Sequence, residues 1–247
     1  MVLLPSIFKP KYEYDIVRLG TNYDGGYLVE RSSIFKSDCL ISFGISTNWD
    51  FEKDFINLNN IKLLAYDGSI SSRSWNELIK KKIKRGSFNK ALKLIYQKNK
   101  FFKFFNEKNF FSKNIGNIDT NSISLKQILS DNKEDNIFFK IDIEGSEYEI
   151  LSEIVYFQNQ IIGLCIEFHS CNKNLHQIIK FIENFNLEVV HIHANNYKLP
   201  PPNEIPDVLE FTFARDPNIK GDFKGLPNAL DMPNKSKENE IVLNFNS

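Results

Sequence analysis

The sequence predicts an α/β fold with a mostly parallel sheet and helices on both faces. Short apolar runs of strand length alternate with longer segments of helical apolar spacing, which is typical of parallel strands joined by covering helices. The strand-like runs lie at 39–46, 61–69, 136–145, 161–170, 187–196 and 208–215. The chain has 247 residues and no convincing internal boundary, so we expect one domain over residues 1–247.

The helices of this pattern follow the strands in order. After the first strand, which breaks at Gly44, residues 51–58 have apolar side chains at helical spacing. Helices are also expected at about 146–155 and 175–185, after the third and fourth strands. The stretch beyond Arg215 is rich in Asn, Lys and Pro, which predicts a partly disordered tail over about 216–247.

A basic segment at about 74–111 interrupts the alternation, and we expect it to be a helical insertion. It predicts one or two helices, with a stripe of phenylalanines in KFFKFFNEKNFF. From Lys80 to Lys108 there are eleven Lys or Arg residues and one acid, Glu107, although the whole chain is neutral. This asymmetry favours an anionic ligand near one face, and a merely solvated basic helix is the alternative. The phenylalanines suit a core, an interface or a lid, which leaves a homo-oligomer open.

Composition argues against several classes of protein. No apolar run approaches the roughly 20 residues of a membrane span, and the first residues lack the regions of a signal peptide. We therefore expect no membrane span and a cytoplasmic protein. The three cysteines have no Cys-x-x-Cys spacing, which argues against a disulfide framework or a zinc ribbon. With a neutral net charge and no binding-module motif, a nucleic-acid partner is not expected.

Polar residues stand at the ends of five of the expected strands. They are Gly44 with Ser46, Asp67, Asp142 with Glu144, Glu167 with His169, and His191 with His193. Any one of them could be a helix cap. In open α/β sheets, however, ligands bind outside the carboxyl ends of the strands, and five polar ends together predict a site there.

The first two strand ends suit an adenosine ligand. A glycine at position 44 lets the backbone approach a ligand closely, and an acid such as Asp67 can accept hydrogen bonds from ribose hydroxyls. The sequence GISTNW is not G-x-G-x-x-G, so the pyrophosphate cradle of a dinucleotide site is missing. S-adenosylmethionine is the common adenosine ligand without a pyrophosphate.

One acidic block carries a family resemblance. The stretch FFKIDIEGSEYEIL (138–151) closely resembles the Lys-Ile-Asp-(Val/Ile)-Glu-Gly-(Ala/Ser)-Glu signature of FkbM-like methyltransferases. Other similar blocks are RLGTNYDGGYLV (18–29), SFGISTNWDFE (42–52), CIEFH (165–169) and VLEFTFAR (208–215). The first cofactor block departs from the family's more usual Asp-x-Gly-x-Asn-x-Gly form. The resemblance covers roughly residues 15–215 apart from the basic segment, and it implies a Rossmann-like class I fold that moves a methyl group from S-adenosylmethionine to oxygen, often on a sugar.

The resemblance also implies roles for residues by position. Around the cofactor it implies Asp24, Gly25, Gly26, Gly44, Ser46, Asp67 and Asp119. Among these, Asp67 would hold the ribose hydroxyls, Asp24 would lie near the amino acid end, and Asp119 would lie on the adenine side. Asp142 would face the reacting centre.

A sugar hydroxyl is a poor nucleophile and needs a base or a divalent metal. Asp142, Glu167 and His193 follow strands that should be neighbours, and two carboxylates with an imidazole suit Mn²⁺, Fe²⁺ or Mg²⁺. His169 and His193 compete for the role of base or ligand, and a satisfied structural histidine is the alternative for each. Glu144 can be explained instead by its place near a helix N-terminus.

For the acceptor, family habits suggest a nucleotide-linked sugar of surface polysaccharide assembly, such as a GDP-heptose. Glu144 and Asn195 are candidates to contact the sugar, and Lys82 and Arg85 to contact its diphosphate. Two rival functions stay open. One is a metal-dependent hydrolase built on the Asp, Glu and His residues, and the other is a non-catalytic module that binds S-adenosylmethionine.

Overall fold

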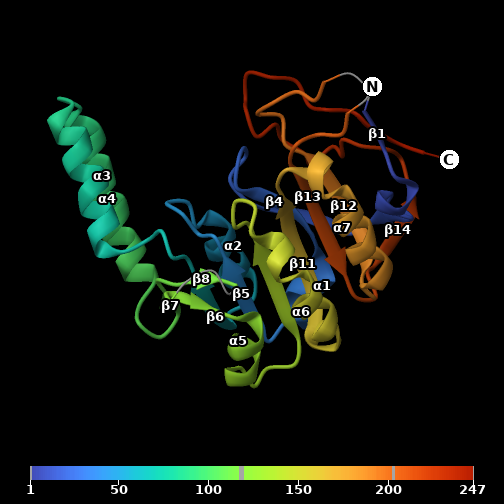
Figure 1. Ribbon diagram of the computed structural model, residues 1–247, viewed down its shortest axis with the longest axis horizontal. Coiled ribbons are helices and arrows are strands. Elements are labelled where there is room, and N and C mark those ends of the chain that lie inside the picture. The colour runs from blue at the N-terminus through green and yellow to red at the C-terminus, as the bar shows by residue number, and fades with distance from the viewer. Residues whose placement is uncertain (1, 117–119, 202–203, 247) are drawn as a thin grey trace.

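The computed structural model of the protein describes residues 2–116, 120–201 and 204–246. At its centre is a seven-stranded sheet with the strand order β12-β13-β11-β10-β5-β6-β7 (Figure 1). These strands are β5 (Cys39–Phe43), β6 (Lys62–Tyr66), β7 (Phe110–Phe111), β10 (Ile137–Ile141), β11 (Ile161–Phe168), β12 (Glu188–Ala194) and β13 (Leu209–Ala214). Neighbouring strands from β11 to β7 are parallel, and β13 is antiparallel to both β11 and β12.

The order of the strands reverses beside β5. From β5 the chain runs outward through β6 to β7, and it then crosses to β10 and β11 on the other side. The switch point therefore lies between β5 and β10, where open α/β sheets bind their ligands. This is the Rossmann-like class I methyltransferase topology that the resemblance implies.

All six strands expected from the sequence are confirmed, each without some of the residues at its ends. Every residue of β5, β10, β11 and β13 is buried. Strands covered by helices on both faces need such continuous apolar runs. Most polar residues at the ends of the runs belong to the loops that follow the strands, whereas Glu167 lies within β11 and His191 and His193 lie within β12.

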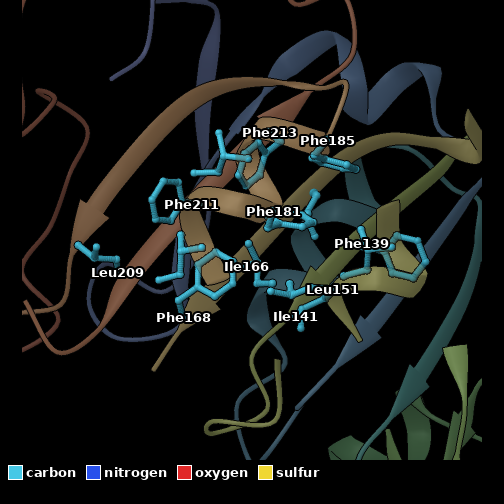
Figure 2. Packing of buried hydrophobic residues seen from close by; sticks show 14 of the residues in the cluster. Phe139, Ile141, Leu151, Ile166, Phe168, Phe181, Phe185, Leu209, Phe211 and Phe213 are labelled. Carbon is cyan, nitrogen blue, oxygen red and sulfur yellow. The ribbon is translucent and has the colours of Figure 1, made fainter. Parts of the chain in front are cut away.

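Helices cover both faces of the sheet, as expected. They are α1 (Arg31–Lys36), α2 (Asp50–Leu58), α5 (Leu125–Asp131), α6 (Leu151–Tyr156) and α7 (Cys171–Asn184), with 3-10 turns η1 (Ser6–Phe8), η2 (Glu147–Glu149) and η3 (Gln158–Gln160). Helices α5 to α7 share a core with Phe139 and Ile166, whereas α1 and α2 pack against Phe138 on the opposite face. In the first of these cores, the Phe213 ring lies 5.7 Å from Phe181 and 5.4 Å from Phe185 (Figure 2).

The basic segment forms a helical hairpin that projects from the body (Figure 1). Its helices are α3 (Ser72–Lys84) and α4 (Phe88–Phe104), which match the one or two helices expected there. The capping box that Ser71 and Ser74 form starts α3. The base of the hairpin is anchored by aromatic contacts, since the Phe101 ring lies 5.3 Å from Trp49 and 5.0 Å from Phe110.

The remaining short strands of the described residues pair in two-stranded sheets outside the central one. They are β1 (Val2–Leu4), β2 (Tyr12–Tyr14), β3 (Ile16–Gly20), β4 (Gly26–Glu30), β8 (Asn114–Ile115), β9 (Ser122–Ile123), β14 (Ile219–Asp222) and β15 (Leu243–Phe245). Strand β14 pairs with β2, and β15 pairs with β1. The prediction of a partly disordered tail is therefore wrong for residues 216–246, because buried polar side chains, Asn234 among them, fix the tail to the body. Composition alone missed these contacts.

Candidate active site

The candidate site lies where β5, β6, β10 and β11 end. The parallel registers bring the last residues of these strands to one edge of the sheet. The loops that leave this edge contain Gly44, Asp67, Asp142 and His169. The structure thus places four of the expected strand ends next to one another.

Gly44 forms the floor of the site. Its φ is +76°, and a Cβ at this position would lie 1.6 Å from the carbonyl oxygen of Asp142. No other residue fits here, because both the conformation and the space exclude a side chain. The Gly44 carbonyl accepts a 2.6 Å hydrogen bond from Lys140 Nζ, so the two central strands are tied together directly below the crevice.

Asp67 organises the neighbouring loops with its carboxylate. Oδ2 accepts a 2.7 Å hydrogen bond from the Ser46 amide, and Oδ1 accepts bonds from the Ser69 amide and hydroxyl at 2.8 and 2.6 Å. A crevice of about 300 Å³ lies between these loops and the one after β10, lined by residues that include Gly44, Ser46, Asp67, Asn114 and Asp142.

These residues fit S-adenosylmethionine. The side chain missing at Gly44 keeps the crevice open, and Asp67 is an acid at the end of the second strand, where ribose hydroxyls can be bound. At Gly68 a Cβ would lie 1.9 Å from Asn114 Oδ1. The absence of a side chain at Gly68 therefore leaves room for Asn114 in the lining of the crevice. Gly44, Ser46 and Asp67, which the resemblance implies at the cofactor, all line this crevice.

Asp142 and Glu167 face each other across a tyrosine. The Tyr27 hydroxyl lies 3.1 Å from Glu167 Oε2 and 3.3 Å from Asp142 Oδ2. Burial, together with the charges of Asp142 and Glu210, raises the pKa of Glu167 well above its usual value. Asp142 is also 3.6 Å from Lys140 Nζ, and Glu167 Oε1 is 3.5 Å from His169 Nε2. The ionised form of Glu167 is therefore disfavoured in this site.

His169 is oriented by a buried carboxylate. Its Nδ1 lies 3.0 Å from Glu147 Oε1, and that oxygen also accepts from the amides of Ile143 and Gly145. Burial disfavours the charged imidazole, but the hydrogen bond and charge of Glu147, with the charges of Glu167 and Asp142, raise the pKa of His169 to about 9. The other ring nitrogen, Nε2, lies 3.6 Å from Glu144 Oε2 and 3.5 Å from Glu167 Oε1.

Three side chains of this site could hold a metal ion. Asp142, Glu144 and His169 each offer one atom, and these atoms lie within 4.8 Å of one another. Glu147 fixes the imidazole through Nδ1 and leaves Nε2 available, which is how carboxylates orient histidine ligands. Two carboxylates and one imidazole suit Mn²⁺, Fe²⁺ or Mg²⁺, so the residues fit a divalent cation.

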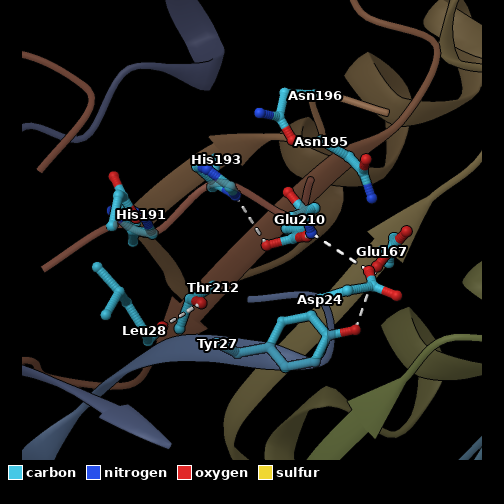
Figure 3. A network of polar contacts seen from close by, with 12 residues as sticks. Asp24, Tyr27, Leu28, Glu167, His191, His193, Asn195, Asn196, Glu210 and Thr212 are labelled. Carbon is cyan, nitrogen blue, oxygen red and sulfur yellow. Dashed lines mark hydrogen bonds and ion pairs between the residues drawn. The ribbon is translucent and has the colours of Figure 1, made fainter. Parts of the chain in front are cut away.

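The expected group of Asp142, Glu167 and His193 is not assembled. His193 Nδ1 lies 3.0 Å from Glu210 Oε2 (Figure 3), and Nε2 lies 2.9 Å from Glu240 Oε2. Both ring nitrogens are therefore engaged. Burial opposes the charge of this imidazole, but Glu210 and Glu240 raise the pKa of His193 well above its usual value. Strand β13 lies between β11 and β12 and inserts Glu210 between His193 and Glu167.

The glycine turn expected to cover the cofactor lies beside the acidic cluster. Asp24, Gly25 and Gly26 close the β3–β4 hairpin, and a Cβ at Gly26 would lie 2.0 Å from the Thr21 carbonyl oxygen. Burial and the charges of Glu210, Asp142 and Glu144 raise the pKa of Asp24, against a hydrogen bond from Asn234. Asp24 in this turn therefore lies beside Tyr27 and Glu167 (Figure 3).

The other predicted residues lie in different places. Asn195 follows β12, and its side-chain oxygen accepts from the Tyr197 amide. Lys82 lies near the end of α3 and Arg85 follows it, about 20 Å along the helix axis from Ser72. The structure does not bring these two cations to the strand ends. Asp119 lies outside the described residues.

Sequence reasoning missed several residues that build the site. Lys140, which is 6% exposed, could have been noticed because it is a lysine inside an apolar strand. Tyr27 could have been noticed because it lies within the block 18–29 that resembles the family. Glu210 alternates with apolar residues in β13, as an ordinary solvent-facing residue would. For Asn234, which donates to Glu210 at 2.6 Å, the polar tail gave no signal.

One family model matches a large part of the chain. The family model described as "Methyltransferase FkbM domain" matches residues 45–199. No curated protein matches the chain.

Several solved structures are distantly similar to the chain. The precorrin-6y C5,15-methyltransferase from Geobacter metallireducens GS-15 is 13% identical, with 74% of this chain and 84% of that chain covered and a TM-score of 0.34. M. capricolum TrmK in complex with S-adenosyl-homocysteine is 14% identical, with 76% and 68% covered and a TM-score of 0.37. An S-adenosylmethionine-dependent methyltransferase from Clostridium acetobutylicum ATCC 824 is 9% identical, with 72% and 83% covered and a TM-score of 0.37. Likenesses this distant carry no information on substrate.

The family match is the decisive comparison, because it covers well over half of the chain. The matched residues include Ser46 and Asp67 of the crevice, the acidic block at Asp142, and His169. The chain belongs to the FkbM family of S-adenosylmethionine-dependent methyltransferases.

Proposed function

We propose that this methyltransferase transfers the methyl group to a sugar hydroxyl, and that Asp142, Glu144 and His169 act on that hydroxyl through a divalent cation. The observation that carries the proposal is the grouping of these three side chains beside the crevice, with His169 held by Glu147. Glu167 and Tyr27 close the site on its buried side.

On the donor side, the crevice residues position the methyl group. Asp67 would hold the ribose hydroxyls, and the backbone at Gly44 would let the donor lie close to Asp142. Methyl transfer is an in-line displacement, so most of the acceleration comes from holding the acceptor oxygen against the methyl carbon. The carbon–oxygen bond forms as the carbon–sulfur bond breaks, which leaves S-adenosylhomocysteine.

On the acceptor side, the hydroxyl has to lose a proton. With a pKa of about 9, His169 is protonated at neutral pH in the metal-free protein and cannot serve as the base in that state. Binding of a cation at Nε2 would displace this proton to solvent, because metals bind the neutral imidazole. A divalent cation held at Asp142, Glu144 and His169 would lower the pKa of the acceptor hydroxyl and orient it. The proton would then pass to the solvent through Glu144, whose side chain is 88% exposed.

The acceptor that we propose is a nucleotide-activated sugar of surface polysaccharide assembly, such as a GDP-heptose. Support for this choice comes from the family resemblance. Lys82 and Arg85 are not included as diphosphate contacts, because a sugar bound at the strand ends would lie far from the end of α3.

The test is to titrate the metal-stripped protein with S-adenosylmethionine by calorimetry, and to titrate Mn²⁺ by electron paramagnetic resonance. We expect micromolar binding of the cofactor without metal. We expect Mn²⁺ binding to be lost in Asp142→Asn and kept in Glu149→Gln, which removes an exposed acid from the same loop region. Methyl transfer to a nucleotide sugar should require the added ion.

Two results would contradict parts of the proposal. Full activity in the presence of a chelator would exclude the cation and leave the methyltransferase assignment intact. Cofactor binding without turnover on any nucleotide sugar, with or without the ion, would favour a different acceptor or a non-catalytic module.

A further inference from the structure

The hairpin of α3 and α4 exposes apolar side chains in an ordered row. On α4, Phe88, Leu92 and Tyr96 are 64%, 65% and 60% exposed, and Ile95 and Phe102 are each 39% exposed. Their spacing of three, four and seven residues places them along one side of the helix. The opposite side of α4, with Ala91 and Phe101, is buried. The exposed row is therefore an apolar face that this chain does not cover.

The same hairpin carries a concentrated positive charge. From residue 72 to 104 there are eleven Lys or Arg residues and one acid, Glu77. The whole chain is neutral, so the hairpin holds the positive charge and the remainder is correspondingly acidic. Lys93, Lys100 and Lys103 are exposed on α4, and Lys100 Nζ lies 4.6 Å from the centre of the Tyr96 ring in the apolar row. The long side chains of these lysines can extend past an apolar contact and keep their charges in water.

Three kinds of partner suit a basic surface, and only one of them suits the apolar row as well. A nucleic acid would neutralise the lysines but leave Phe88 and Leu92 in water. Two hairpins of this chain would repel each other through their like charges. An anionic lipid bilayer satisfies both features, because phosphate headgroups pair with lysines while apolar side chains enter the interface.

We propose that the α3–α4 hairpin docks on the surface of an anionic lipid bilayer, with Phe88, Leu92 and Tyr96 inserted at the level of the headgroups. Insertion would be shallow. Among the described residues, no helix has the length and apolarity to span a bilayer.

The position of the hairpin gives this docking a consequence for the site. Helix α3 begins three residues after Ser69, and β7 is followed closely by Lys113 and Asn114, and all three of these residues line the crevice. The hairpin is thus inserted between two walls of the candidate active site. Docking would hold the crevice close to the membrane surface.

The test is sedimentation of the full chain with vesicles of phosphatidylcholine alone or with 30% phosphatidylglycerol, at low and at high salt. We expect the protein to sediment with the anionic vesicles only, and to be released at high salt because the lysine contacts are screened. The inference does not depend on the proposed acceptor or metal, since the readout is binding.

Two sets of variants separate charge from apolar insertion. Lys81, Lys82 and Lys84 changed to Gln should weaken binding by about 100-fold, at about fivefold for each lysine. The matched control changes Lys173, Lys180 and Lys237, which are exposed lysines outside the hairpin, and should bind as the native protein does. Phe88→Ser with Leu92→Ser should abolish sedimentation at any charge density.

The proposal is overturned if the native protein stays in solution with anionic vesicles. It is also overturned if the control variant with three lysines changed outside the hairpin loses as much vesicle binding as the hairpin variant. Positive charge on any part of the surface would then be enough for binding. Binding to RNA or heparin without binding to vesicles would assign the surface to a soluble polyanion. A dimer that Phe88→Ser with Leu92→Ser dissociates, without vesicle binding, would assign it to a second copy of the chain. Circular dichroism of each variant checks that the hairpin is folded.

Discussion

His169 and His193 lie near the same edge of the sheet, one just after β11 and the other near the end of β12, yet their surroundings differ. Nearby carboxylates raise the pKa of both imidazoles. His169 has one carboxylate at 3.0 Å on Nδ1, while its Nε2 lies 3.6 and 3.5 Å from Glu144 and Glu167. His193 has a carboxylate within 3.0 Å on each nitrogen. A histidine held on one nitrogen can still bind a ligand, whereas one held on both serves to connect segments.

The segments that His193 connects are far apart in the sequence. Glu210 is on the neighbouring strand, and Glu240 is on the C-terminal tail. A second pair, His191 with Asp231 at 2.9 Å, attaches the same tail. The cluster of His193 therefore holds the tail against the sheet, whereas the cluster of His169 is the one that we propose acts in methyl transfer.

The sharpest way to break this comparison is to remove each imidazole, and His169→Ala should have the larger effect. Because the candidate cation site loses one of three ligands, we expect kcat to fall by about 1000-fold, or about 4 kcal/mol. The free energy of unfolding should fall by only about 1–2 kcal/mol, since Glu147 keeps its two backbone donors. Methyl transfer assays at saturating cofactor measure the loss. His176→Ala, at an exposed position on α7, is the control, and a loss under tenfold in His169→Ala would contradict the assignment.

Removal of His193 should act on stability instead. In His193→Ala, Glu210 and Glu240 lose their cation, and breaking a buried ion pair costs about 3–5 kcal/mol. Urea denaturation at pH 7 measures this change. Activity of the protein that stays folded should remain within a few-fold of the native value. If unfolding free energy is unchanged while activity is lost, the roles of the two histidines are reversed.

The sequence could predict the first cluster far better than the second. Asp142, Glu144 and Glu147 lie within one short block, and His169 follows the next strand, so neighbouring parallel strands bring them together. The sheet itself was predictable from its apolar runs for the same reason, since short-range patterns determine it. His193 was grouped with Asp142 because the strand ends were expected to be adjacent.

What the sequence could not show was the antiparallel insertion of β13. That strand places Glu210 between His193 and the site, and it brings the tail residues Asn234 and Glu240 alongside. Such contacts join residues that are 17, 24 and 47 positions apart, and neither periodicity nor spacing encodes them. The tail was misjudged because its composition is polar, although its buried polar side chains are paired with the body.

The pH dependence of stability offers a smaller effect with a definite sign. His169 has a folded pKa of about 9, above the unfolded value of about 6.5. Its stabilising contribution is therefore complete below pH 6.5 and is lost as the pH rises to about 9. After allowance for partial solvent exposure, we expect the unfolding free energy of His169→Ala to fall over this pH range by about 1–2 kcal/mol less than that of the native protein. Denaturation curves from pH 6 to 9.5 test this, and identical slopes in both proteins would show that His169 has no raised pKa.

The smallest effect comes from the two carboxylates that face the second nitrogen of each histidine. Glu240 lies 2.9 Å from His193 Nε2 with a side chain 20% exposed, whereas Glu144 lies 3.6 Å from His169 Nε2 and is 88% exposed. Glu240→Gln keeps a hydrogen-bond acceptor but loses the charge, so it should cost about 1 kcal/mol of unfolding free energy and leave Mn²⁺ affinity unchanged. Glu144→Gln should change stability by less than about 0.5 kcal/mol and weaken Mn²⁺ binding at least about tenfold. The two substitutions are chemically identical. Opposite outcomes in the two assays would therefore show that the cluster of His169 binds a cation and that the cluster of His193 stabilises the fold. Equal stability losses without any change in Mn²⁺ affinity would instead mean that both histidines only connect segments.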